Sequence, residues 1–143
     1  MTEKKKIKVM FLCTANSCRS QMAEGLARRL GGDILEIYSA GLFAHYVQPM
    51  AIQVMKETGI DITNQTSDAI DEEELRKMDI IISLCGHAEK TCPATPQRIR
   101  RIHWPIDDPV GFMGTEEQTL NEFRRARDEI KEKIERFINE LRA

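Results

Sequence analysis

One short stretch near the amino terminus carries residues whose types and spacing suit oxyanion chemistry. An apolar run ends at Cys13, five residues follow, and Arg19 and Ser20 then lead into helix-forming sequence. The backbone N–H groups of such a strand–loop–helix turn converge on an anion, and the positive end of the helix dipole adds to them. The same field favours the thiolate of Cys13, and Arg19 can hold two oxygens of the anion at once. The stretch predicts a thiolate nucleophile facing a bound oxyanion; the plain alternative is a buried structural cysteine with a surface arginine.

The loop itself supplies the predicted oxyanion-binding residues, which are Thr14, Ala15, Asn16, Ser17, Cys18, Arg19 and Ser20. Ser20 could donate a hydrogen bond to the Cys13 thiolate, or it could merely cap the helix. We expect Cys18 to be a packing thiol, and the functional alternative is a protective Cys13–Cys18 disulfide under oxidation.

Two further cysteines follow another apolar run. Cys85 ends a buried-strand pattern, and six residues separate it from Cys92, which lies in a stretch with two prolines, residues 86–97, that we expect to be irregular. A disulfide requires Cα atoms within about 7 Å, which a mobile loop can achieve. Cys85 could therefore reach Cys13 on one side and Cys92 on the other, passing an oxidation outward by thiolate exchange. The alternatives are two thiols without a partner role, or a zinc site that includes His87, although closed zinc sites normally have four ligands.

The elements that must position these residues alternate between strands and helices. Apolar runs at 7–12, 35–40, 80–84 and 99–103 predict strands, and helical patterns are found at about 17–30, 49–58, 72–78 and from 116 onward. Residues 60–67 are expected to be extended. The alternation predicts one α/β domain over residues 1–143, with a central parallel sheet of about four strands flanked by helices. Ligands collect beyond the carboxyl ends of such strands, where Cys13 and Cys85 both lie.

Composition narrows the class of protein. With a net charge of −2 over 143 residues, the chain offers no general attraction for nucleic acid or an anionic membrane. No run approaches the roughly 20 apolar residues of a membrane span, and no signal-peptide pattern precedes the first strand. We therefore expect a cytoplasmic protein, and we also expect a monomer without a tightly bound cofactor. Four cysteines in a reducing compartment indicate catalysis or metal binding rather than permanent disulfides.

The loop Cys13-Thr-Ala-Asn-Ser-Cys-Arg-Ser20 resembles the phosphate-binding loop of low-molecular-weight protein tyrosine phosphatases. It resembles more closely the loop of the thioredoxin-coupled arsenate reductases that share that fold. The resemblance continues through residues 21–25, 38–41, 65–68, 84–85, 92–93 and 103–109, and so covers nearly the whole chain. It implies the phosphatase-like fold and a left-handed turn at Asn16. Ala15 departs from the glycine frequent in these loops, and it would cost stability if positive φ were needed there.

The resemblance also implies a reductase cycle with arsenate as substrate and phosphate or sulfate as mimics. In that cycle Cys13 attacks arsenate, and Asp108 protonates the leaving oxygen. Cys85 then attacks the adduct, which releases arsenite and leaves a Cys13–Cys85 disulfide. Cys92 converts this to a Cys85–Cys92 disulfide, which thioredoxin reduces. A phosphatase has no use for the two additional thiols, so their presence favours the reductase.

Some of these reductases hold a potassium ion beside the loop. The matching positions are Asn16, Glu24, Ser39, Thr66 and Asp68, all of which carry oxygen and suit a hard cation. Asn16, Glu24 and Asp68 could equally form a hydrogen-bond network that braces the loop. The resemblance leaves both arrangements open.

Two other functions remain open at this point. A protein tyrosine phosphatase would use the same loop, but Val110 follows Asp108-Pro109 where those enzymes usually have an aromatic residue. Weak phosphatase activity is still compatible with the loop, because phosphate and arsenate are close in shape and charge. A non-enzymatic oxyanion or redox sensor would instead use the thiols to switch a binding surface.

Overall fold

The computed structural model describes residues 5–143, which form a four-stranded parallel sheet with helices on both faces. The strands are β1 (Ile7–Cys13), β2 (Leu35–Gly41), β3 (Ile80–Ser83) and β4 (Arg100–His103). The helices are α1 (Arg19–Gly31), α2 (Pro49–Lys56), α3 (Glu72–Leu75), α4 (Gly86–Thr91) and α5 (Glu116–Arg142). The strand order is β2-β1-β3-β4, and every pairing is parallel. The predicted α/β architecture is confirmed.

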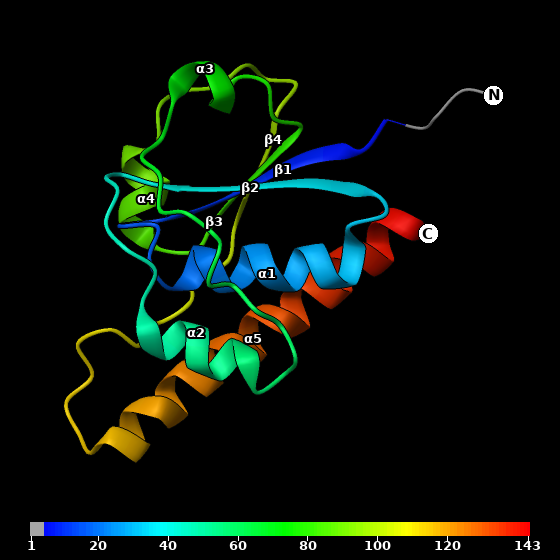
Figure 1. The fold of residues 1–143 in the computed structure, drawn as a ribbon. Helices are drawn as coiled ribbons and strands as arrows, with labels where there is room; N and C mark the ends of the chain where they lie inside the picture. Colours follow the sequence, from blue (N-terminus) through cyan, green and yellow to red (C-terminus); the bar gives the residue numbers. More distant parts are fainter. Residues whose placement is uncertain (1–4) are drawn as a thin grey trace.

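Two layers of helices bury the sheet. Figure 1 shows α1, α2 and α5 on one face and α3 and α4 on the other. Along β1, Val9 and Phe11 join the core beneath α1, α2 and α5, whereas Met10 and Leu12 join the core on the opposite face. A strand covered on both sides has no solvent-facing position, which explains why β1 reads as a continuous apolar run.

The register of the sheet brings the catalytic candidates to one edge. Leu12 of β1 lies opposite Ser83 of β3, and the Leu84 N–H donates to the Leu12 carbonyl at 2.8 Å. Cys13, the last residue of β1, and Cys85, which follows β3, therefore lie where these neighbouring strands leave the sheet. On the other side of β1, the Leu42 N–H donates to the Thr14 carbonyl at 2.8 Å and fixes the start of the loop.

The stretch after β3 differs from the sequence-based expectation. Residues 86–97 were expected to be irregular, which is wrong for Gly86–Thr91, because these residues form α4. The helix has only six residues, starts with glycine and buries Ala88 alone, so it leaves almost no periodic signal in the sequence. Cys85 and Cys92 lie at its two ends and not in a mobile loop.

The remaining differences concern element boundaries. Asp71 caps α3 as predicted, with its Oδ1 accepting from the Glu73 N–H at 2.9 Å, but the helix ends at Leu75 instead of 78. Residues 60–67 form no strand, and β4 begins one residue later than expected. Within residues 5–143, no helix combines the length and apolar character needed to cross a bilayer.

Candidate active site

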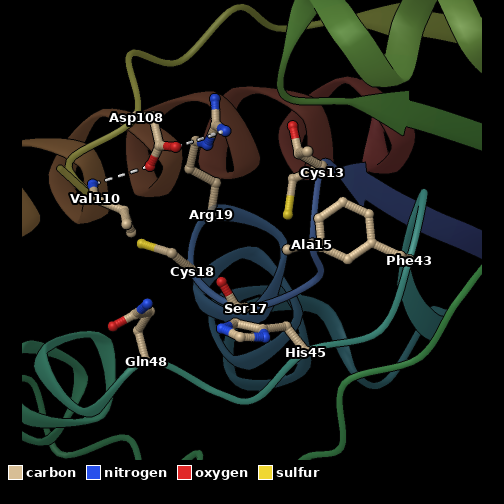
Figure 2. Close-up of a pocket in the computed structure, with 11 residues that line it drawn as sticks. Cys13, Ala15, Ser17, Cys18, Arg19, Phe43, His45, Gln48, Asp108 and Val110 are labelled. Carbon is tan, nitrogen blue, oxygen red and sulfur yellow. Dashed lines mark hydrogen bonds and ion pairs between the residues drawn. The ribbon is translucent and has the colours of Figure 1, made fainter.

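The loop between β1 and α1 opens into a cavity of about 410 Å³ at the carboxyl edge of the sheet (Figure 2). Cys13 ends β1 and Arg19 begins α1, so both are anchored on regular elements. Cys18 occupies the N-cap position without a side-chain cap hydrogen bond, and the first turn of α1 carries no acidic residue. No side chain therefore neutralises the positive N-terminal end of α1, which can interact with a bound anion. Asn16 has φ 48°, the left-handed conformation expected of it, and Ala15 needs no positive φ.

Cys13 is buried, and its sulfur contacts the Ser20 hydroxyl. Its Sγ lies 2.8 Å from the Ser20 Oγ, which in turn accepts a hydrogen bond from the Asn16 Nδ2 at 2.7 Å. Because the Ser20 oxygen already accepts from Asn16, its own hydrogen is free to point at the sulfur. This arrangement places a hydroxyl donor against the sulfur that faces the cavity.

Arg19 is held in place by two oxygens at the rim of the cavity. Its Nη1 donates to the Ile106 carbonyl at 2.9 Å, and its Nη2 lies 3.3 Å from the Asp108 Oδ2. The other Asp108 oxygen accepts from the Val110 N–H at 3.0 Å, and Figure 2 shows both contacts. Arg19 is buried, whereas the Asp108 carboxylate that it pairs with is about half exposed.

The five residues expected to hold potassium lie together behind the loop. Asn16 Nδ2 donates to the Ser39 Oγ at 3.0 Å, and Ser39 donates to the Glu24 Oε1 at 2.5 Å. Asn16 Oδ1 accepts from the Asp68 N–H, and Thr66 Oγ1 donates to the Asp68 Oδ2.

The guanidinium of Arg28 pairs with the carboxylate of this network. Arg28 Nη1 lies 2.5 Å from the Glu24 Oε2. Burial raises the pKa of Glu24, and the Ser39 hydrogen bond and the Arg28 guanidinium oppose that shift. The oxygens are of the type that a hard cation takes, but they are engaged with one another and with Arg28. These contacts are those of a bracing network, and potassium binding at the same residues stays a prediction.

Cys85 lies beside the loop, although it is 71 residues from Thr14 in the sequence. Its Sγ is 3.2 Å from the Thr14 Oγ1, and it accepts from the Ala88 N–H at 3.3 Å as the N-cap of α4. Cys13 and Cys85 belong to the same buried cluster. The polar neighbours of the Cys85 sulfur are thus the Thr14 hydroxyl and the backbone of the first turn of α4.

Cys92 is half-buried at the far end of α4 and packs against the same cluster. Burial raises the pKa of Cys92, an effect that the nearby Arg101 guanidinium opposes. Seven residues of helical rise separate the Cα atoms of Cys85 and Cys92, roughly 10 Å at 1.5 Å per residue. That exceeds the 7 Å limit for a disulfide, so α4 must unwind before these two sulfurs can join.

Cys18 lies in a different environment from the other thiols. Burial raises the pKa of Cys18 well above its ordinary value, and the neighbouring Cys13 and Asp108 add to the shift. This is the environment of a protonated packing thiol. In residues 5–143, no three His, Cys, Asp or Glu side chains are grouped so that they could hold a metal ion.

The cavity wall contains residues that sequence reasoning missed. Phe43, His45 and Gln48 approach from the segment after β2, and Val110 approaches from the loop before α5 (Figure 2). Phe43 and Val110 are both exposed apolar side chains. None of these residues belongs to a recognisable sequence motif. Val110 differs from the phosphatase pattern, which usually has an aromatic residue at this position. These side chains extend the cavity beyond the loop that is predicted to hold the oxyanion.

Comparisons with known proteins agree with the fold and with the loop. Residues 8–143 match the family described as "Low molecular weight phosphotyrosine protein phosphatase". The chain is 54% identical over 129 residues to "Arsenate reductase" of Halalkalibacterium halodurans, which covers 90% of this chain and 93% of the relative. A solved structure, "An arsenate reductase in the phosphate binding state", is 40% identical with a TM-score of 0.77, over 94% of this chain and 98% of that one. The low molecular weight protein tyrosine phosphatase from T. tengcongensis is 26% identical with a TM-score of 0.79, over 94% and 99%. The resemblance seen in the sequence is confirmed.

Proposed function

Since the chain belongs to the low molecular weight phosphotyrosine protein phosphatase family, we propose that it acts within that family as an arsenate reductase. The single observation that carries this proposal is the position of Cys85, whose sulfur lies 3.2 Å from the hydroxyl of the residue next to Cys13. A hydrolase of this family needs one nucleophilic sulfur and water. A second sulfur at this position, with Cys92 at the end of the same short helix, supplies the two electrons that a reduction requires.

The first step takes place in the loop. Arsenate binds over the N-terminus of α1 with two oxygens on Arg19, and the Cys13 thiolate attacks arsenic. One arsenic–oxygen bond breaks, and the oxygen leaves as water after it takes a proton from Asp108. Ser20 stabilises the thiolate before attack, through the contact at 2.8 Å.

The second step is the reduction. The Cys85 thiolate attacks the Cys13 sulfur, a Cys13–Cys85 disulfide forms, and the electron pair of the sulfur–arsenic bond remains on arsenic. Arsenic(V) leaves as arsenite, so the two thiols have supplied both electrons. The Cys92 thiolate next attacks Cys85, which forms the Cys85–Cys92 disulfide and returns Cys13 as a thiolate.

The last exchange carries the oxidation from the buried loop to a helix end. Because α4 separates Cys85 from Cys92, the exchange requires α4 to unwind, and the unwound segment presents the new disulfide to a reductant. A dithiol carrier such as thioredoxin then restores both thiols. We propose thioredoxin as this partner and a monomer in the cytoplasm as the working form.

The experiment compares Cys92→Ser with His87→Gln as a control, since His87 is an exposed residue of the helix that Cys92 follows. With thioredoxin, thioredoxin reductase and NADPH, Cys92→Ser should release about one arsenite per protein and then stop, with a Cys13–Cys85 disulfide in the mass map. The His87→Gln variant should continue to turn over. Sustained turnover by Cys92→Ser, or no disulfide in the wild-type protein after stoichiometric arsenate, would exclude the relay.

A phosphotyrosine phosphatase is the second candidate, and the exposed Phe43 at the cavity mouth is the observation that favours it. Its ring could contact a phenyl ester in place of the aromatic residue that Val110 replaces. Hydrolysis of p-nitrophenyl phosphate by the Cys85→Ser variant tests this function separately, because hydrolysis does not need the second sulfur.

A further inference from the structure

The interactions within helix α4 are too few to keep it helical by themselves. It has six residues, far fewer than an isolated helix needs in water. Gly86 occupies its first position, a weak sulfur acceptor caps it, and Ala88 is its one buried residue. Its stability must come from contacts with the sheet.

One polar contact joins the middle of α4 to the sheet. Glu89, in the first turn of α4, accepts a hydrogen bond through its Oε2 from the Ser83 Oγ at 2.5 Å. Ser83 ends β3 and is 1% exposed, so the acceptor comes to a buried hydroxyl on a rigid strand. A hydrogen bond from a buried donor to a carboxylate is among the stronger side-chain contacts.

The contact continues to the next strand. His103, the last residue of β4, places its Nδ1 2.9 Å from the Ser83 Oγ. The Ser83 hydroxyl has one hydrogen, and the Ile102 carbonyl lies at the limiting distance of 3.5 Å, so Glu89 is the better acceptor. The Ser83 oxygen then accepts from the Nδ1–H of His103, which fixes the direction of both hydrogen bonds.

We propose that Glu89, Ser83 and His103 form a latch that holds α4 helical in the reduced protein and limits the rate at which Cys92 reaches Cys85. The role of the latch in the relay rests on the proposed function. Arg101 Nη1 donates to the Pro93 carbonyl at 3.2 Å, so the chain beyond Cys92 stays attached to β4 when the latch opens. Opening is then confined to the segment between the two cysteines, which keeps Cys92 close to its target.

The latch makes Glu89 and Ser83 positioning residues, because neither touches the reacting sulfur atoms in the contacts described. Removing either the Glu89 carboxylate or the Ser83 hydroxyl should favour the unwound form of α4. We expect amide exchange of residues 86–91 to become about tenfold faster, the low end for a hydrogen bond to a charged group, since Glu89 is partly exposed. Exchange in β1 and β3 should not change.

The test measures hydrogen exchange of the reduced full-length protein without arsenate, so its result does not depend on reductase activity. The variants are Glu89→Gln, Ser83→Ala and the double variant, with the exposed His87→Gln on the same helix as control. Ser83→Ala leaves every residue of α4 unchanged and so separates the latch from helix propensity. Each single variant should accelerate exchange about tenfold, the double variant should add little, and the control should match the wild type. Additive effects, or wild-type exchange in Ser83→Ala, would overturn the latch.

A second measurement distinguishes positioning from general destabilisation. After one equivalent of arsenate, the conversion of the Cys13–Cys85 disulfide into the Cys85–Cys92 disulfide should be several-fold faster in Glu89→Gln, with unchanged phosphate affinity. A variant that merely weakens the fold would lower anion affinity as well. Faster amide exchange without any disulfide would disprove the reductase while leaving the latch intact. Faster amide exchange with an unchanged rate of disulfide conversion would disprove the part of the latch in the relay.

Discussion

Gly41, at the end of β2, lies against the loop that follows Cys13, and its replacement by alanine should distort that loop. A Cβ at Gly41 would lie 2.5 Å from the Asn16 nitrogen, 2.8 Å from the Ala15 carbonyl carbon and 2.9 Å from the Thr14 oxygen. All three are backbone atoms, so no side chain can rotate away, and the loop itself must move. Overpacking of this kind costs about 1–3 kcal/mol of unfolding free energy. For a chain of this size that corresponds to a fall in Tm of roughly 3–15 °C.

Loop displacement should be visible in anion binding as well as in stability. We expect calorimetric titration with phosphate to give at least a tenfold weaker Kd for Gly41→Ala, because the N–H groups no longer converge. Gly86→Ala is the matched control, since a Cβ there meets no heavy atom within 4 Å. It should keep both the Tm and the phosphate affinity of the wild type or raise the Tm slightly. If Gly41→Ala matches the control in both measurements, the close approach of β2 does not shape the loop.

Three further predictions concern charges. Hydrogen bonds from Arg124 and Arg127 lower the pKa of Glu57 from 4.5 to about 2, so this stabilisation is present above pH 4.5 and lost as the pH falls through about 2. Glu57→Gln should therefore lower the unfolding free energy by about 1 kcal/mol at pH 7, a value reduced for solvent screening, and by almost nothing at pH 2, as urea titrations can test. Arg19→Lys keeps the charge but loses the planar fork, so phosphate should bind at least about tenfold more weakly; equal affinity would exclude bidentate binding. Asp108→Asn should slow single-turnover arsenite release by about 10²–10⁴-fold with phosphate affinity little changed, whereas a wild-type rate would exclude Asp108 as the proton donor.

The sequence predicted the local geometry around the loop well, because its signals are local. Cys13, Arg19 and Ser20 lie within one strand–loop–helix turn, and Asn16 takes the left-handed conformation expected of it. The apolar runs identified all four strands because the sheet is buried on both faces. Element ends shifted by a few residues where capping and pairing, which depend on neighbours, decided them.

The stretch between Cys85 and Cys92 could not be predicted in the same way. Its helix is too short for periodicity, and the sheet, through Ser83 and a small buried patch at Ala88, supplies the contacts that hold it. The presence of α4 matters for function, because a helix holds Cys85 and Cys92 at a fixed distance that a loop would not impose. The Glu89 contact that we propose as a latch involves residues with no motif.

What the sequence by itself determined was the set of groups able to do chemistry, because a thiol, a guanidinium and a hydroxyl within one turn already define an anion site. Only the tertiary structure decided which distant groups meet it. Parallel pairing of β1 with β3 brings Cys85 to Thr14 across 71 residues, and the segment after β2 supplies Phe43 to the cavity wall. Such contacts depend on the register of the sheet and on the packing of loops, which are properties of the whole chain rather than of any short stretch.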